Sequence, residues 1–111
     1  MSNEKPKGGY LARKAAMLCQ DNQFRLYLDR RRAAKFDLEV PDGTHTEDDA
    51  RDFILMACGI DSRAELDHDQ QAATIYRQIM HHFRRWIDRQ NRRDQLVTAR
   101  NNWKSPNDKY L

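Results

Sequence analysis

Arginine side chains offer the clearest chemistry in this sequence. Near the C-terminus, helical spacing places Arg85, Arg89 and Arg92 on one face and puts Arg93 beside Arg89. A planar guanidinium donates two hydrogen bonds at once, which suits a phosphate group. In chain order the first set is Arg30, Arg31 and Arg32, and the second set is this C-terminal group together with Arg84. The candidate nucleic-acid-binding residues are Arg30, Arg31, Arg32, Arg84, Arg85, Arg89, Arg92 and Arg93.

Two arginine sets on one small domain could bracket a nucleic-acid backbone. They would neutralise about four to six phosphates, so binding should weaken steeply as the salt concentration rises. The alternative is a solvated helix face on which some of the arginines pair with carboxylates. The sequence leaves both interpretations open.

Charge along the chain is sorted into three blocks. Residues 1–36 carry nine Lys/Arg and three Asp/Glu, residues 37–69 carry two and eleven, and residues 70–111 carry nine and three. The blocks have net charges of +6, −9 and +6, although the whole chain is only +3. Sorted charge builds a local field that a mixed surface lacks. The acidic block either offsets the arginines or imitates DNA toward a basic partner.

Motifs for catalysis or metal binding are missing from the sequence. His81 and His82 are adjacent and point about 100° apart on a helix, so they cannot chelate one ion together. His45 and His68 stand alone, and the carboxylates form no calcium-loop pattern. No H-x-x-x-H, G-x-S-x-G or glycine-rich phosphate loop occurs. We therefore expect no catalytic residue, no metal ion, no cofactor and no enzyme activity.

Apolar spacing divides the first part of the chain into helices. An i, i+4, i+7 pattern predicts a helix from about Tyr10 to Cys19. Asp21 can cap a second helix. Residues 36–40 alternate apolar and polar side chains but have no partner strand, so they predict an extended linker before a turn at 41–43.

The middle of the sequence predicts a buried helix at 47–58. Thr46 and Asp49 form a capping box at its start, and Gly59 can supply a left-handed residue at its end. Apolar side chains occupy nearly the whole circumference, which is typical of a helix that is buried on all sides. The Ser62–Glu65 pair is a further capping box, which restarts a helix at once.

The longest helix is predicted over 69–90. Its apolar stripe holds for about four turns and consists of Ala72, Ile75, Tyr76, Ile79, Phe83, Trp86 and Ile87. Gln90 and Arg93 then occupy positions that should continue the stripe. Any helix beyond Gln90 is therefore expected to project into solvent or toward a partner.

These elements predict an all-α protein. The expected architecture is a compact bundle of four or five helices with a long C-terminal helix and mobile tails. Its regions are a flexible N-terminal tail at 1–9, a single helical domain at 10–100 and a C-terminal tail at 101–111.

The cysteines and the apolar runs indicate the compartment. Cys19 and Cys58 lie far apart in the sequence and have apolar neighbours. This pattern predicts two reduced, buried thiols in a cytoplasmic protein. The longest apolar run, 53–58, is too short to span a membrane. We expect a cytoplasmic protein that makes no membrane contact.

One segment resembles known sequences. The run Ala57-Cys58-Gly59-Ile60-Asp61-Ser62-Arg63-Ala64-Glu65-Leu66 resembles a segment of small phage and prophage proteins. In those proteins a helix ends in Cys-Gly-Ile/Val, Ser-Arg-x-Glu-Leu follows, and a long helix with aromatic residues comes next. The resemblance extends over residues 10–87 and includes Cys19-Gln20-Asp21. It implies a gene among phage replication and recombination functions, and it brings no activity and no catalytic residue with it.

The expected function is that of a small nucleic-acid-associated accessory protein, encoded by a phage or prophage. It would act by binding through the arginine-rich helix face, with DNA rather than RNA as the expected partner. The alternative is a protein-interaction module, an inhibitor or adaptor of a host nucleic-acid enzyme. That module would use the acidic block or the long helix. A homodimer is a further alternative, because so thin a core can leave part of the wide apolar stripe uncovered.

Overall fold

The computed structural model describes the backbone of residues 8–108 and the side chains of residues 8–97. The elements are α1 (Tyr10–Gln20), α2 (Asn22–Phe36), α3 (Glu47–Cys58), the short 3-10 helix η1 (Arg63–Asp67) and α4 (Gln70–Asp108). No strand occurs in the described part of the chain, so the predicted all-α fold is confirmed there. Residues 1–7 and 109–111, parts of the two predicted tails, lie outside it.

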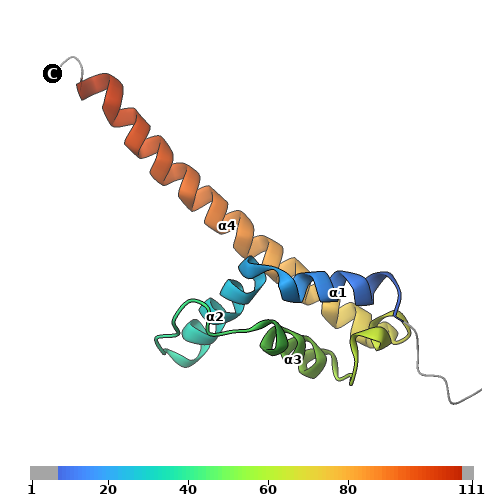
Figure 1. Ribbon diagram of the computed structural model, residues 1–111. Coiled ribbons are helices and arrows are strands. Elements are labelled where there is room, and N and C mark those ends of the chain that lie inside the picture. Colours follow the sequence, from blue (N-terminus) through green and yellow to red (C-terminus); the bar gives the residue numbers. More distant parts are fainter. Residues whose placement is uncertain (1–7, 109–111) are drawn as a thin grey trace, which may run out of the picture.

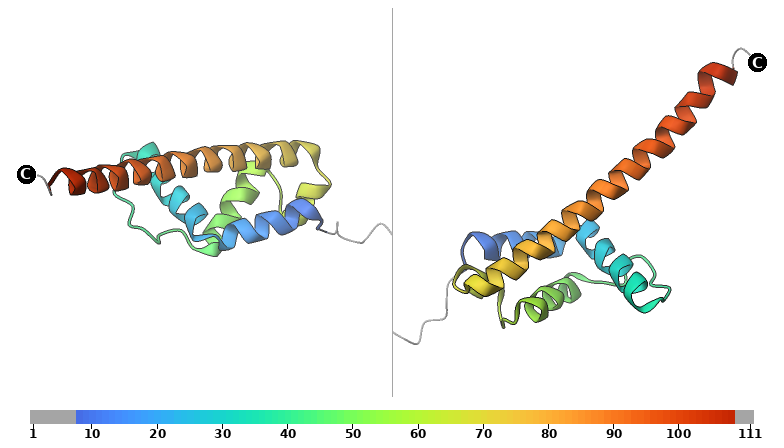
Figure 2. Two further views of the ribbon diagram at one scale, coloured as in Figure 1. Left: turned by 90° about the horizontal axis from the view of Figure 1, so that it is seen from above. Right: turned by 180° about the vertical axis from the view of Figure 1, so that it is seen from behind.

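The first half of α4 is the spine of the molecule. Figures 1 and 2 show α1, α2 and α3 gathered around this half, while the second half continues past them without a neighbour among the described residues. The short helix η1 connects α3 to α4 and packs against both α1 and α4. The protein is accordingly elongated, with principal extents of 79 × 29 × 20 Å.

Local capping sets the helix boundaries. The Asp21 side chain accepts a hydrogen bond from the Gln23 backbone N–H and begins α2. The Thr46–Asp49 capping box begins α3, as predicted. Gly59 ends α3 in the left-handed conformation, with a φ of 68°. These interactions span only three or four residues, so they could be predicted from the sequence.

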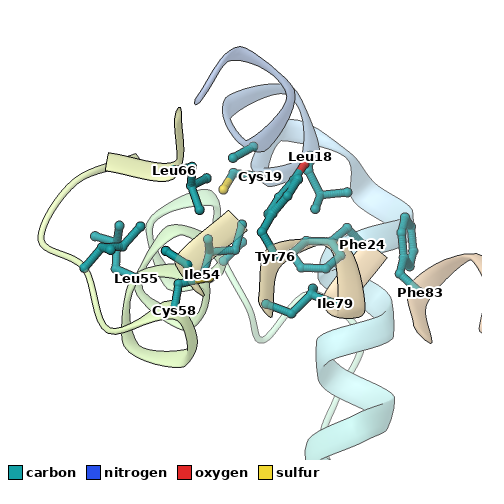
Figure 3. Packing of buried hydrophobic residues seen from close by; sticks show 14 of the residues in the cluster. Leu18, Cys19, Phe24, Ile54, Leu55, Cys58, Leu66, Tyr76, Ile79 and Phe83 are labelled. Carbon is teal, nitrogen blue, oxygen red and sulfur yellow. The ribbon is translucent and has the colours of Figure 1, made fainter. Parts of the chain in front are cut away.

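The core joins all four α-helices and η1. Phe24 of α2, Ile54 of α3 and Leu66 of η1 are almost completely buried. Figure 3 shows these three side chains in one cluster with side chains of α4, including Tyr76 and Phe83. The Phe24 and Phe83 rings meet edge-on, with their centroids 5.2 Å apart. Packing of α2 on α4 therefore depends on aromatic rings.

The prediction that α3 is buried on all sides is wrong. Its inner face carries the buried residues Ala50, Ile54 and Cys58, but Met56 is 83% exposed. Three neighbouring elements cover α3, and they lie on one side of it (Figure 1). A chain of this size has no further layer for the other side, so α3 is amphipathic.

The apolar stripe of α4 is confirmed through Ile87. All seven stripe residues are buried or half-buried in the single chain, so the stripe itself gives no reason for a homodimer. Leu96 and Val97 are 63% and 51% exposed, and the stripe has ended there as predicted. The helix is therefore packed along its first half only.

The helical backbone of α4 continues past residue 101, where the predicted C-terminal tail begins. The backbone of α4 stays helical to Asp108, which gives a length of about 58 Å at 1.5 Å per residue. No Gly or Pro occurs between Gln70 and Ser105. Once the packed half has formed, each further residue adds a backbone hydrogen bond at little cost, and Pro106 is the first helix breaker that the helix meets.

Candidate nucleic-acid interface

A groove between α2 and α4 brings the two arginine sets together. It has a volume of about 450 Å³ and is lined by Tyr27, Arg31, His82, Arg85 and Arg89. We call it the α2–α4 groove. One arginine comes from the first predicted set and two come from the second.

Helical spacing and aromatic packing position these side chains. Tyr27 and Arg31 are four residues apart on α2, so they share one face. Arg85 and Arg89 have the same spacing on α4, and their side chains lie about 6 Å apart along its axis. The Tyr27 ring centroid lies 5.6 Å from that of Phe83 and 5.6 Å from that of Trp86. These ring contacts hold α2 against α4 and thereby fix the distance across the groove.

Arg31 is oriented by a further aromatic ring. Its guanidinium carbon lies 5.1 Å from the centroid of the Phe53 ring of α3. A guanidinium over a ring face is attracted by the ring quadrupole and keeps its hydrogen-bond donors free. Arg31 remains exposed, so its donors can reach a ligand in the groove.

The arginines of the α2–α4 groove carry uncompensated charge. Among the described side chains, Arg30 and Asp42 form the one salt bridge between an arginine or lysine and a carboxylate, with a nitrogen–oxygen distance of 3.0 Å. Arg31, Arg85 and Arg89 therefore lack an acidic partner in the part of the chain with described side chains. A cationic groove of this kind attracts anions.

The remaining arginines of the first set lie toward the acidic block. Arg30 is paired with Asp42 of the loop after α2. Hydrogen bonds from Thr46 hold the pKa of Asp49 below its ordinary value, and the nearby charge of Arg32 adds to this effect. The structure thus separates Arg30 and Arg32 from Arg31, although the three are consecutive in the sequence.

The second set is divided as well. Arg84 precedes Arg85 by one residue and points about 100° away around the helix, so it lines a different groove, between α1 and α4. Arg92 and Arg93 are exposed on the half of α4 that has no neighbour. The structure therefore brings together three of the eight predicted residues, Arg31, Arg85 and Arg89.

Four of the eleven carboxylates in the acidic block accept backbone hydrogen bonds at helix starts: Asp49, Glu65, Asp67 and Asp69. The Asp67 side chain accepts hydrogen bonds from the backbone N–H groups of Gly9, Leu11 and Ala12, at 2.6, 2.9 and 3.1 Å. It therefore caps the start of α1 from η1, and it also fixes the last residue of the predicted N-terminal tail. No salt bridge joins the acidic block to α4 among the described side chains. The acidic block does not neutralise the α4 arginines by direct pairing.

Three residues were missed by sequence reasoning. Tyr27 and His82 line the α2–α4 groove, and their spacing from the arginines, i, i+4 and i, i+3, is the signal that could have shown it. His45 was predicted to stand alone, but its Nδ1 lies 2.6 Å from Oδ1 of Asp29. The loop between α2 and α3 folds back on α2 and brings His45 to Asp29. No local sequence motif predicts a contact of this kind.

Other kinds of site are not formed by the described residues. No group of three or more His, Cys, Asp or Glu side chains is placed to hold a metal ion within the described range. Cys19 and Cys58 are free and buried, as predicted, and burial raises the pKa of both thiols. None of the described helices has the length and hydropathy needed to cross a bilayer.

The chain was compared with protein-family models, with curated proteins and with solved structures, and none of them matches it.

Proposed function

We propose that this protein is a small nucleic-acid-associated accessory protein that acts by binding, with the phosphate backbone of DNA lying in the α2–α4 groove. We further propose that it is phage or prophage encoded and works in the cytoplasm. The first proposal rests on one observation: Arg31, Arg85 and Arg89 converge from two helices and have no carboxylate partner among the described side chains.

The chemistry of the groove suits phosphate. Each guanidinium can donate two hydrogen bonds to phosphate oxygens. Arg92 and Arg93 extend the cationic surface along the free half of α4, which makes five arginines in all. Five phosphate contacts on a duplex correspond to a slope of about −4.5 in log affinity against log salt. Backbone contacts of this kind position a protein on DNA without reading its sequence, so we expect little sequence preference.

A binding series tests the proposal directly. Fluorescence anisotropy with a labelled 20-base-pair duplex would be measured between 50 and 200 mM salt for the wild type and the Arg85→Glu/Arg89→Glu variant. The variant should lose at least tenfold in affinity, because two favourable contacts become repulsive. Arg13→Glu/Arg51→Glu is the matched control, since it changes the net charge equally on the side formed by α1 and α3. Equal affinities of the wild type and the groove variant would contradict the proposal.

A second candidate function is a protein-interaction module that acts on a host nucleic-acid enzyme. The outer face of α3 favours it, because Asp48, Asp52 and Met56 recur at intervals of four residues and are all exposed. An exposed methionine beside carboxylates suits a basic, partly apolar partner surface. Two results together would favour this candidate. The protein would fail to bind DNA at 50 mM salt, and it would form a stoichiometric complex with an enzyme that the Met56→Asp variant does not form.

A further inference from the structure

A second groove lies on the other flank of α4, against α1. It has a volume of about 350 Å³ and is lined by residues of both helices, among them Tyr10, Lys14, Tyr76, Arg77 and Arg84. We call it the α1–α4 groove. Arg84 lies about 100° around the helix from Arg85, so the two grooves do not share their arginines.

The rim of the α1–α4 groove is cationic. Lys14 comes from α1, whereas Arg77 and Arg84 are seven residues apart on one face of α4. None of these three side chains forms a salt bridge with a described carboxylate. The Lys14 ammonium lies 5.4 Å from the centroid of the Tyr10 ring, whose residue is 63% exposed. Cationic groups therefore meet an accessible aromatic ring at this groove.

The wall of the groove holds a buried donor without an acceptor. Tyr76 is 3% exposed, and its hydroxyl is the one buried side-chain nitrogen or oxygen that has no hydrogen-bond partner among the described residues. Figure 3 shows Tyr76 running from α4 toward α1, with its hydroxyl end beside Leu18. Burial raises the pKa of Tyr76 to about 12, so the hydroxyl keeps its proton and remains a donor at neutral pH.

An unpartnered hydroxyl is costly to the folded protein by itself. Burying it without an acceptor forfeits its hydrogen bonds to water, and a phenylalanine would fill the same space without that loss. Core packing alone therefore does not account for a tyrosine at this position. The hydroxyl makes no contact with solvent, so a ligand oxygen in the α1–α4 groove supplies the missing acceptor only when the side chains that cover the hydroxyl move aside.

We infer that the α1–α4 groove binds a small phosphorylated ligand that carries a planar ring, of the class of nucleoside diphosphates. Lys14, Arg77 and Arg84 bind the phosphates as charge-assisted donors. The hydroxyl of Tyr76 donates to a ligand oxygen, and the exposed Tyr10 ring stacks on the planar ring. The groove volume lies within the range of small-molecule sites. This site is independent of DNA binding at the α2–α4 groove.

Isothermal titration calorimetry on the full chain tests the inference, with ADP, pyrophosphate and adenosine as separate probes. ADP should bind more tightly than pyrophosphate, and adenosine should bind most weakly. Lys14→Ala/Arg77→Ala should raise the Kd for ADP at least tenfold. Arg85→Ala/Arg89→Ala, which removes equal charge from the α2–α4 groove, should leave that Kd unchanged. No heat with ADP, or an equal loss in both double variants, would overturn the inference.

The Tyr76→Phe variant separates ligand binding from folding. Its melting temperature should equal or exceed that of the wild type, because it removes an unpartnered buried hydroxyl. Its Kd for ADP should nevertheless rise about tenfold, as expected for a lost hydrogen bond to a charged group. A raised melting temperature with an unchanged Kd for ADP would show that the Tyr76 hydroxyl does not contact the ligand, and it would overturn the role proposed for it.

Competition distinguishes a free nucleotide from a nucleic-acid backbone. An excess of duplex DNA should not displace ADP from the Arg85→Ala/Arg89→Ala variant, because that variant has lost two of the five proposed DNA contacts and retains the whole α1–α4 groove. Displacement would assign the α1–α4 groove to DNA phosphates and would overturn the inference.

Discussion

Nδ1 of His45 lies 2.6 Å from Oδ1 of Asp29, a carboxylate whose side chain has no solvent exposure. The backbone N–H groups of Gly43 and His45 donate to the same carboxylate, each at 2.9 Å. One buried side chain on α2 thus accepts three hydrogen bonds from the loop that leads to α3. Because a buried carboxylate needs its donors, the loop and α2 stabilise each other.

Replacing Asp29 should destabilise the fold. In Asp29→Asn the amide presents N–H groups to donors, so at least one buried group loses its partner, and the free energy of unfolding should fall by about 1–3 kcal/mol. Urea denaturation monitored by circular dichroism measures the change. Asp42→Asn is the control, since it breaks an exposed pair with Arg30 and should cost less than about 1 kcal/mol. Similar losses in the two variants would contradict the structural role of Asp29.

Acid should destabilise the protein through Asp29 and Asp67. Burial alone would raise the pKa of Asp29, but hydrogen bonds from His45 and Gly43 outweigh it and hold that pKa below its ordinary value. Burial of Asp67 is likewise outweighed, by the backbone N–H groups of Leu11, Gly9 and Ala12, so its pKa is also lowered. The unfolded chain therefore binds protons more tightly at both sites.

These two carboxylates consequently make their full contribution to the free energy of unfolding above about pH 4. That contribution is lost as the pH falls through their lowered pKa values. Urea midpoints measured from pH 7 to pH 2 should show this loss. The Asp29→Asn/Asp67→Asn variant should start from a lower midpoint and depend less on pH. A wild-type midpoint that stays constant below pH 4 would argue against both carboxylates.

Neighbouring arginines of α2 should differ in DNA binding. Arg31→Ala removes a free guanidinium from the α2–α4 groove, so the salt slope of duplex binding should fall in magnitude by about 0.9. Arg30→Ala should change the slope less, because Arg30 is already paired with Asp42. The two slopes come from the same anisotropy series at several salt concentrations. Identical slopes for the two variants would refute the assignment of Arg31 to the interface.

The free half of α4 should contribute little to folding. Leu96→Ser/Val97→Ser alters exposed side chains and should change the free energy of unfolding by less than about 0.5 kcal/mol per site. Ile79→Ala, at a buried position of the same helix, should cost about 2–5 kcal/mol. Thermal and urea melts of the two variants give the comparison. A large loss in the Leu96/Val97 variant would show that this half packs against something in solution.

Local features of the fold could be predicted from the sequence. The Thr46–Asp49 box and Gly59 delimit α3 at the predicted residues, because caps act over a few positions of the chain. The exposed side of α3 could not be predicted in this way, since burial depends on how many neighbouring helices exist. The apolar side chain of Met56 predicted a buried position, but so small a fold has no further helix to cover that side of α3.

The candidate site was only partly predictable, because it depends on contacts between segments that are far apart in the sequence. Helical spacing grouped Arg85 with Arg89, which lie on one helix. The addition of Arg31 and the removal of Arg84 depend on how α2 and α4 cross, and aromatic contacts between distant segments set that crossing. The Asp29–His45 pair likewise depends on the path of a loop. Spacing along the chain carries no direct information about either.

The unsupported half of α4 also affects how the molecule behaves in solution. The radius of gyration is 19.2 Å, whereas a compact chain of this length would have about 13 Å. A particle of that shape experiences more drag than a sphere of equal mass, so a single chain will leave a gel-filtration column early and resemble a dimer. Molar mass must therefore come from light scattering or sedimentation equilibrium, in which 13.2 kDa identifies the monomer regardless of shape.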